Sequence, residues 1–176
     1  SYGELEITPV DTEVVVTIKG KTGNVKYDGV EHTVAGYTVE SITMGGADYG
    51  LYKASDFGLK EGKEAKASGT DADTYPMNLT AGDFENTNRN FTNVKFVVID
   101  GSLTITKRKV TLTSGSDSKV YDGKPLTKNE VKVTDDGFAE GEGASYNVTG
   151  TLTNVGEVPN TFTYTLNEGT KADNYE

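Results

Sequence analysis

The nine residues Lys119–Thr127 are KVYDGKPLT, and the ten residues Val25–Val34 are VKYDGVEHTV. Both stretches contain Tyr-Asp-Gly. Asp-Gly is a strong signal for a tight turn, because Asp forms local hydrogen bonds and Gly adopts positive φ without steric cost. A Tyr before the turn can cover a small core with its ring while its hydroxyl finds a polar partner. We therefore predict structural turns at Tyr27, Asp28 and Gly29 and at Tyr121, Asp122 and Gly123.

The residues around the two turns match in the same order along the chain. Outward from the turns, the matched blocks are Val16–Ile18 with Val110–Leu112, Asn90–Phe91 with Asn174–Tyr175, and GELEIT (Gly3–Thr8) with GSLTIT (Gly101–Thr106). The spacing changes only between blocks, as insertions in surface loops would make it do. The sequence therefore predicts a tandem repeat.

The order of the blocks predicts where each repeat begins and ends. We expect residues 1–9 to be the closing strand of a preceding repeat and residues 10–106 to form repeat 1. Residues 107–176 then form repeat 2, which lacks its closing strand. An unpaired sheet edge recruits partners. We therefore expect Gly3–Thr8 to be able to fill the empty position in a neighbouring copy by strand exchange.

The hydrophobic patterns are those of β-strands. Val14, Val16 and Ile18 alternate with Val15 and Thr17, and Phe162, Tyr164 and Leu166 share one predicted face. Phe96–Ile99 is a continuous apolar run that predicts a strand at the centre of a sheet or buried on both faces. Lys60–Ala67 has helical composition but no apolar face, so we expect no helix of more than a turn or two there.

We predict an all-β fold of two tandem small antiparallel β-sandwich (Ig-like) domains, with β-grasp-like repeats as the alternative.

The composition excludes several classes of function. The chain has 176 residues, no cysteine, one histidine and a net charge of −10. Without cysteine there is no disulfide, thiolate metal site or Cys nucleophile. The acidic balance disfavours binding to nucleic acid. No apolar stretch of about 20 residues is present, so we expect no membrane insertion.

Several stretches resemble the MBG/YDG-type repeats of bacterial, often Gram-positive, cell-surface proteins. They are KVYDGKPLT, GFAEGEGASYNVTGT (Gly137–Thr151), TFTYTLNEGTKADNY (Thr161–Tyr175) and the junction GSLTITKRKV (Gly101–Val110). The resemblance covers nearly all of repeat 2 and less of repeat 1, which departs from it between Gly45 and Lys66. It implies an all-β adhesin-like module that is extracellular and attached to the cell wall through its parent protein. It implies no catalytic residue.

No constellation in the sequence predicts an enzyme. His32 is the only histidine and lies beside a predicted strand, so we expect it to be an exposed strand residue and not the base of a catalytic pair. Two acidic clusters, Asp71 with Asp73 and Asp135-Asp136 with Glu140 and Glu142, do not complete a calcium-loop pattern. We therefore predict no catalytic site, no metal site and no cofactor.

Three aromatic residues in the part of repeat 1 that departs from the repeat pattern are candidate glycan contacts: Tyr49, Tyr52 and Phe57. Exposed rings on loops can stack on sugars. In the alternative, they pack a long insertion onto the sheet. The function we expect is that of a non-enzymatic stalk or spacer repeat, whose partners are neighbouring repeats. A module that binds carbohydrate or a mucin-like host glycoprotein is the alternative.

Overall fold

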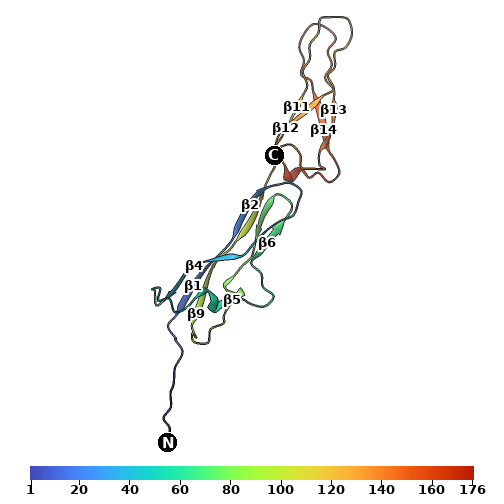
Figure 1. Cartoon of the computed structure of the whole chain (residues 1–176). Helices are drawn as coiled ribbons and strands as arrows, with labels where there is room; N and C mark the ends of the chain where they lie inside the picture. Colours follow the sequence, from blue (N-terminus) through green and yellow to red (C-terminus); the bar gives the residue numbers. More distant parts are fainter. The chain divides into compact units, whose positions relative to one another are not determined.

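A computed structural model describes all residues, 1–176, and confirms the all-β class. It contains fourteen strands, three single 3-10 turns and no α-helix (Figure 1). The strands are β1 (Val14–Gly20), β2 (Thr22–Lys26), β3 (His32–Ala35), β4 (Tyr37–Met44), β5 (Phe57–Leu59), β6 (Lys66–Gly69), β7 (Asp73–Pro76), β8 (Phe84–Asn86), β9 (Val94–Ile99), β10 (Ser102–Thr106), β11 (Val110–Ser114), β12 (Val131–Asp135), β13 (Ala144–Val148) and β14 (Phe162–Leu166). The 3-10 turns are η1 (Ala54–Asp56), η2 (Ala81–Asp83) and η3 (Ala172–Asn174).

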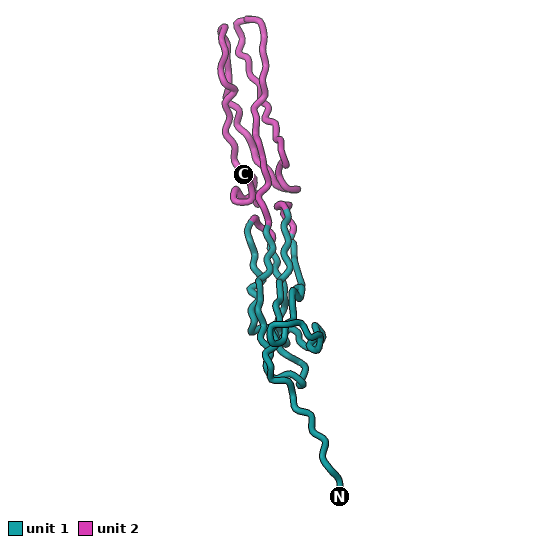
Figure 2. The backbone as a smooth tube through the Cα atoms, turned by 90° about the vertical axis from the view of Figure 1, so that its left-hand side faces the viewer, with its two compact units in different colours: residues 1–25, 31–69, 73–104 teal, residues 26–30, 70–72, 105–176 magenta.

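The chain forms two compact units (Figure 2). Unit 1 comprises residues 1–25, 31–69 and 73–104, and unit 2 comprises residues 26–30, 70–72 and 105–176. The first Tyr-Asp-Gly turn therefore belongs to unit 2, although it lies within the range predicted for repeat 1. The repeat boundaries at residues 9 and 106 stay a prediction.

Strand β1 is the centre of the main sheet of unit 1, whose strand order is β4-β1-β9. It alternates between buried and less buried positions, as the sequence predicts, and the side chains of Val14, Val16 and Ile18 are fully buried. Its pairing with β4 is antiparallel, but its pairing with β9 is parallel. A purely antiparallel sheet was the expectation, so this pairing is a correction.

The apolar run Phe96–Ile99 is not at a sheet centre, which corrects a second expectation. It lies in β9, which is an edge strand because β1 is its only partner. Phe96 faces the core, where its ring centroid is 5.6 Å from that of Phe57. Ile99 on the other face is 50% exposed. An apolar run therefore does not reveal how many neighbours a strand has.

Strand β10 is the middle strand of the second sheet, whose order is β2-β10-β7. Leu103 and Ile105 are each only 2% exposed, as the alternating GSLTIT pattern predicts. The Ser102 N–H donates to the Lys21 carbonyl at 3.2 Å. A Cβ added to Gly101 would lie 2.4 Å from that same carbonyl oxygen, so glycine is required for this close approach.

Two similar 3-10 turns in unit 1 are each followed by an aromatic residue whose ring lies in the core. The turns Ala54–Asp56 and Ala81–Asp83 are each followed by Phe, and the carboxylates of Asp56 and Asp83 accept hydrogen bonds of 2.8 Å from the backbone N–H groups of Lys53 and Thr80. The rings of Phe57 and Phe84 then meet with centroids 6.3 Å apart. The segment 60–67 forms no helix, as its missing apolar face predicts.

Unit 2 repeats part of this arrangement. Strands β11 and β12 pair antiparallel with Leu112 opposite Val133, and these two residues match Ile18 and Val39, which pair in β1 and β4. Isolated parallel bridges also match, since Val10 pairs with Phe91 in unit 1 and Arg108 pairs with Tyr175 in unit 2. Residues that the sequence matches to one another therefore make matching pairings in the two units.

Strands β13 and β14 form the other ladder of unit 2, and its buried face is incomplete. Tyr146 lies opposite Tyr164, and the rings of Tyr146 and Phe162 meet edge to face. Tyr164 is nevertheless 57% exposed, so the predicted face of β14 is only partly covered.

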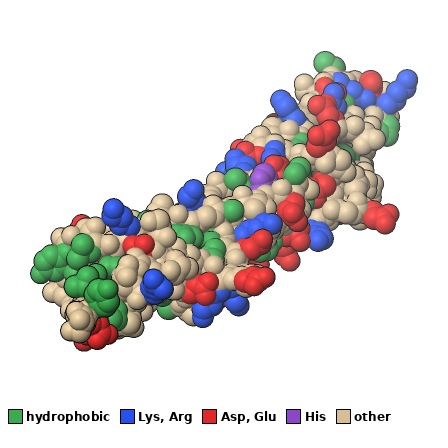
Figure 3. Space-filling view, turned by 60° about the horizontal axis from the view of Figure 1, so that its bottom comes forward, with side chains coloured by type: hydrophobic (Ala, Val, Ile, Leu, Met, Phe, Trp, Pro, Cys, Tyr) green, Lys and Arg blue, Asp and Glu red, His purple; other side chains and the backbone are tan.

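Hydrophobic side chains gather at the lower left end of the face shown in Figure 3. Acidic and basic side chains lie interspersed on the face shown in Figure 3. No helix has the length and apolar character needed to cross a membrane.

Candidate functional site

Both Tyr-Asp-Gly segments form the same turn. The Asp28 carboxylate accepts a hydrogen bond of 3.0 Å from the Val30 N–H, and the Asp122 carboxylate accepts one of 2.9 Å from the Lys124 N–H. The following glycines have φ values of +80° and +75°. Such an Asx turn is set by local chemistry, because the side chain bonds the backbone two residues later. The turn geometry predicted from the sequence is present in both copies.

The Tyr of the first turn is buried inside unit 2. Tyr27 is 4% exposed, and its ring meets that of Tyr175 edge to face with centroids 5.7 Å apart. Its hydroxyl donates to the Glu142 carboxylate, whose two oxygens lie 3.0 and 2.9 Å away. Burial, followed by the hydrogen bond to Glu142, raises the pKa of Tyr27 to about 12. The Tyr27 hydroxyl therefore stays protonated at neutral pH and donates its hydrogen bond to Glu142.

Tyr175 shares the same carboxylate. Its hydroxyl donates to Glu142 at 3.0 Å and accepts a hydrogen bond of 3.1 Å from the Ala139 N–H. The Phe138 ring packs edge to face on Tyr175, with centroids 5.2 Å apart. We call Tyr27, Phe138, Glu142 and Tyr175 the tyrosine joint. It combines apolar contact with a carboxylate that two hydroxyls satisfy.

Arg108 fixes the backbone beside the tyrosine joint. Its guanidinium donates to three carbonyl oxygens, those of Gly137 at 3.0 Å, Tyr27 at 3.2 Å and Asp136 at 2.7 Å. The Lys26 ammonium lies 2.6 Å from an Asp136 oxygen. That contact and the Lys109 N–H hold the pKa of Asp136 below its usual value. The turn at residues 26–30 is thus attached to unit 2 by several polar contacts as well as by a ring.

The short segment 70–72 is held in unit 2 by a buried amide. Asn174 is 1% exposed; its side-chain oxygen accepts from the Ala72 N–H at 2.7 Å, and its nitrogen donates to Asp71 at 3.0 Å. The Lys171 ammonium lies 3.1 Å from Asp71. The hydrogen bond from Asn174, followed by Lys171, lowers the pKa of Asp71. Asp71, one of the carboxylates considered as a calcium ligand, therefore contacts the Asn174 side-chain amide and the Lys171 ammonium instead.

The second turn has the same backbone geometry, but its tyrosine ring is exposed to solvent. Tyr121 is 63% exposed, and Val120 beside it is 88% exposed. Lys119 forms an ion pair with Asp122 at 2.8 Å and lowers the pKa of that carboxyl. Val155, on a separate loop of unit 2, is 92% exposed.

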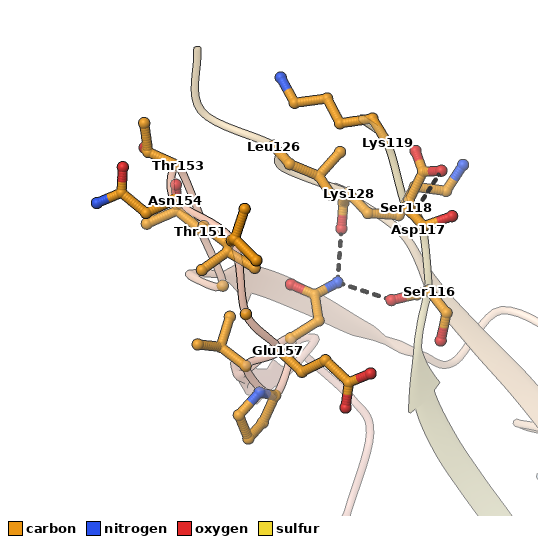
Figure 4. A pocket seen from close by; sticks show the side chains of 18 of the residues that line it. Ser116, Asp117, Ser118, Lys119, Leu126, Lys128, Thr151, Thr153, Asn154 and Glu157 are labelled. Carbon is orange, nitrogen blue, oxygen red and sulfur yellow. Dashed lines mark hydrogen bonds between the residues drawn. The ribbon is translucent and has the colours of Figure 1, made fainter. Parts of the chain in front are cut away.

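A hollow of about 600 Å³ lies beside the second turn (Figure 4). Figure 4 shows Ser116, Asp117, Ser118 and Lys119 on one side and Thr151, Thr153 and Asn154 on the other, with Leu126 and Lys128 between them. The Asn160 side-chain nitrogen donates to the carbonyls of Gly115 at 2.9 Å and Lys128 at 2.8 Å, drawn as dashed lines. Apolar side chains that line the hollow are Tyr121, Leu126, Leu152, Val155, Val158 and Pro159.

The three aromatic residues proposed as glycan contacts do not share one surface. Tyr52 and Phe57 are 5% and 6% exposed, and their rings stack in the core of unit 1 with centroids 6.4 Å apart. The Tyr52 hydroxyl donates to Asn86 at 2.9 Å. Only Tyr49 is exposed, at 62%. The insertion is thus packed onto the sheet through Tyr52 and Phe57, which corrects their placement as surface residues.

The other candidate residues lie in separate contacts. No group of three or more His, Asp or Glu side chains is arranged to hold a metal ion. His32 is half-buried in β3, opposite Gly69 of β6. Asp135 accepts from the Thr111 hydroxyl. Glu142, considered in the sequence only as a calcium candidate, is instead the acceptor of the tyrosine joint.

The residues that sequence reasoning missed are Arg108, Asn160 and Asn174. The match of Asn174–Tyr175 to Asn90–Phe91 is the one signal that marks part of this group.

No protein-family model, curated protein or solved structure matches this chain.

Proposed function

We propose that this chain is a non-enzymatic spacer segment of a bacterial surface protein, in which successive repeats are joined through their Tyr-Asp-Gly turns. The observation that carries the proposal is the contrast between Tyr27, which is buried in the tyrosine joint, and Tyr121, which is exposed in an identical turn. The turn at residues 26–30 belongs to unit 2, although the repeat pattern of the sequence places it in repeat 1.

The proposal includes the finer architecture and the location. Each repeat is a small β-sandwich in tandem with the next, and the array is extracellular and attached to the cell wall through its parent protein. The location follows from the resemblance to MBG/YDG-type repeats. The tyrosine joint supports the serial arrangement. Glu142 accepts hydrogen bonds from both Tyr27 and Tyr175, so its site fits a turn that carries a tyrosine at this position.

A second candidate function is glycan binding through the loop that carries Tyr49. The observation in its favour is that Tyr49 and Leu51 are 62% and 59% exposed on one loop. Exposed aromatic rings can stack on sugars. Two of the three rings first considered for this role are buried, so the spacer function is favoured.

A glycan array that includes mucin glycans tests the proposal on the full chain. The spacer function predicts no saturable binding by the wild-type chain or by Tyr49→Ala. Saturable binding by the wild type that Tyr49→Ala abolishes would support the glycan module and overturn the spacer function. Tyr121→Ala is the matched control, since it removes an equally exposed ring from unit 2.

A further inference from the structure

Strand β9 is the regular edge of the main sheet of unit 1. This sheet, β4-β1-β9, has two edge strands (Figure 1). The register between β4 and β1 shifts at Glu40, which has no partner residue in the ladder, so β4 carries a bulge. The pairing of β9 with β1 is regular over all six residues, Val94–Ile99. Bulges, prolines and charged residues protect a sheet edge from other strands. Strand β9 has no bulge and no proline, and its one charged residue is Lys95.

The backbone groups of alternate β9 residues point away from β1. The Asn93 carbonyl accepts from the Val14 N–H at 2.8 Å, so the odd-numbered residues that follow also direct their backbone groups towards β1. The N–H and C=O groups of Val94, Phe96 and Val98 therefore point to the free edge. No turn, loop or side-chain hydrogen bond involves these groups. The edge thus presents a row of donors and acceptors to an incoming strand.

One turn approaches β9, but from the core side. The turn η2 packs against β9, and Phe84 directly after it meets Phe96 on the core face with ring centroids 5.8 Å apart. No backbone hydrogen bond joins η2 to β9. The edge is bounded only beyond the strand, where the Asp100 carboxylate accepts from the N–H groups of Asn78 and Leu79 at 3.0 and 2.9 Å. The open part of the edge therefore extends to the last residue of β9.

The outer face of β9 is complementary to itself. Val97 and Ile99 are 38% and 50% exposed there, and Lys95 is exposed beside them. If a two-fold axis relates two antiparallel β9 strands at Val97, this residue lies opposite its own copy and Lys95 lies opposite Ile99. The Lys95 stem then covers Ile99 while its ammonium stays in water, and no like charges face each other. An axis at Phe96 would instead place Ile99 opposite Asn93, without an apolar partner.

We propose that the free edge of β9 pairs with the β9 edge of a second copy of this chain, antiparallel and centred on Val97. Phe96 and Val98, whose backbone groups point to the free edge, exchange hydrogen bonds with Val98 and Phe96 of the second copy. The sheet then continues from β9 of one copy into β9 of the other. Both copies use the same surface, so the contact is isologous and closes at two chains. This inference does not rest on the spacer function, because it concerns the edge of one sheet of unit 1.

Sedimentation of the full chain over a range of concentrations tests the pairing. We expect the mean mass to rise with concentration towards that of two chains. Val97→Lys places two ammonium groups opposite each other at the two-fold axis, so it should weaken self-association more than about tenfold. The matched control is Val133→Lys on β12, since Val133 is 37% exposed on a strand of unit 2, and it should associate like the wild type. A wild-type chain that stays monomeric, or a Val97→Lys chain that associates like the wild type, overturns the proposal.

Cross-linking tests the register without a lysine variant, since the chain has no cysteine of its own. Val97→Cys places two thiols opposite each other in a pair without hydrogen bonds, where opposite side chains lie closest. Oxidation should therefore link two chains through this position. Lys95→Cys is the matched control on the same face of the same strand. It lies opposite Ile99 of the second copy, so its yield of linked chains should be severalfold lower. Equal yields from the two variants contradict the proposed pairing.

Discussion

Tyr27 and Tyr121 begin two turns with nearly identical backbones, yet one ring is buried and the other is exposed. Both turns have an Asp that accepts from the backbone two residues later and a Gly with positive φ. The difference comes from what lies against the ring. Glu142 and Tyr175 cover Tyr27, and no residue of unit 2 covers Tyr121 in the same way. The comparison shows that the turn is a local property and its burial a tertiary one.

Removal of the two rings should give the largest difference between the turns. We expect Tyr27→Ala to lower the free energy of unfolding of unit 2 by about 3 kcal/mol, because a buried aromatic ring and its hydrogen bond to Glu142 are both lost. Tyr121→Ala should change it by less than about 0.5 kcal/mol, since an exposed ring loses little on truncation. Urea unfolding followed at amide NMR signals of unit 2 measures both. Equal costs would show that the tyrosine joint does not hold in solution.

The same distinction between local and tertiary effects explains how far the sequence predicted the structure. The two Asx turns, the buried face of β1 and the GSLTIT strand were all predictable, because each depends on neighbouring residues. The tyrosine joint was not, because Glu142 lies 115 positions from Tyr27 along the chain. No local pattern connects the two residues.

The sequence left the burial of the aromatic residues in the insertion open, because exposed glycan contacts and packing onto the sheet were both alternatives. Tyr52 and Phe57 lie in a Gly-rich insertion that looks like an exposed loop, yet η1 and the hydrogen bond from Lys53 to Asp56 turn Phe57 into the core. The prediction for strand β9 was wrong in the opposite direction, because its apolar sequence predicted a central strand and β9 is an edge strand. In both cases the number of neighbouring elements decides exposure, and composition does not give that number.

Replacement of the two glycines should cost the same in both turns. Gly29→Ala and Gly123→Ala each place a side chain at positive φ, which we expect to destabilise unit 2 by roughly 1–2 kcal/mol. An added Cβ would lie 3.5 Å from the Glu142 carboxylate at Gly29 and 3.9 Å from the Tyr121 hydroxyl at Gly123, so neither meets a clash. Urea unfolding of the two variants side by side tests this. A much larger cost at Gly29 would mean that the joint constrains the turn backbone as well as the ring.

Replacement of only the hydroxyl of Tyr27 should give the smallest of the costs expected at the first turn at neutral pH, and the clearest dependence on pH. Tyr27→Phe keeps the ring and removes one donor to Glu142, at an expected cost of about 1 kcal/mol. The pKa of Tyr27 is raised from 10.0 to about 12 in the folded chain. Its contribution is therefore complete below pH 10 and is lost as the pH rises towards 12, because the unfolded chain ionises first.

We therefore expect the stability of unit 2 to fall between pH 10 and pH 12 and this fall to be shallower in Tyr27→Phe. Some decline should remain in that variant, because burial also raises the pKa of Tyr175, which donates to the same carboxylate. Unfolding in urea at pH values between 9 and 12 measures both slopes. An unchanged slope in Tyr27→Phe would show that the hydroxyl of Tyr27 is not held by Glu142. The buried turn would then owe its difference from the exposed one to ring packing alone.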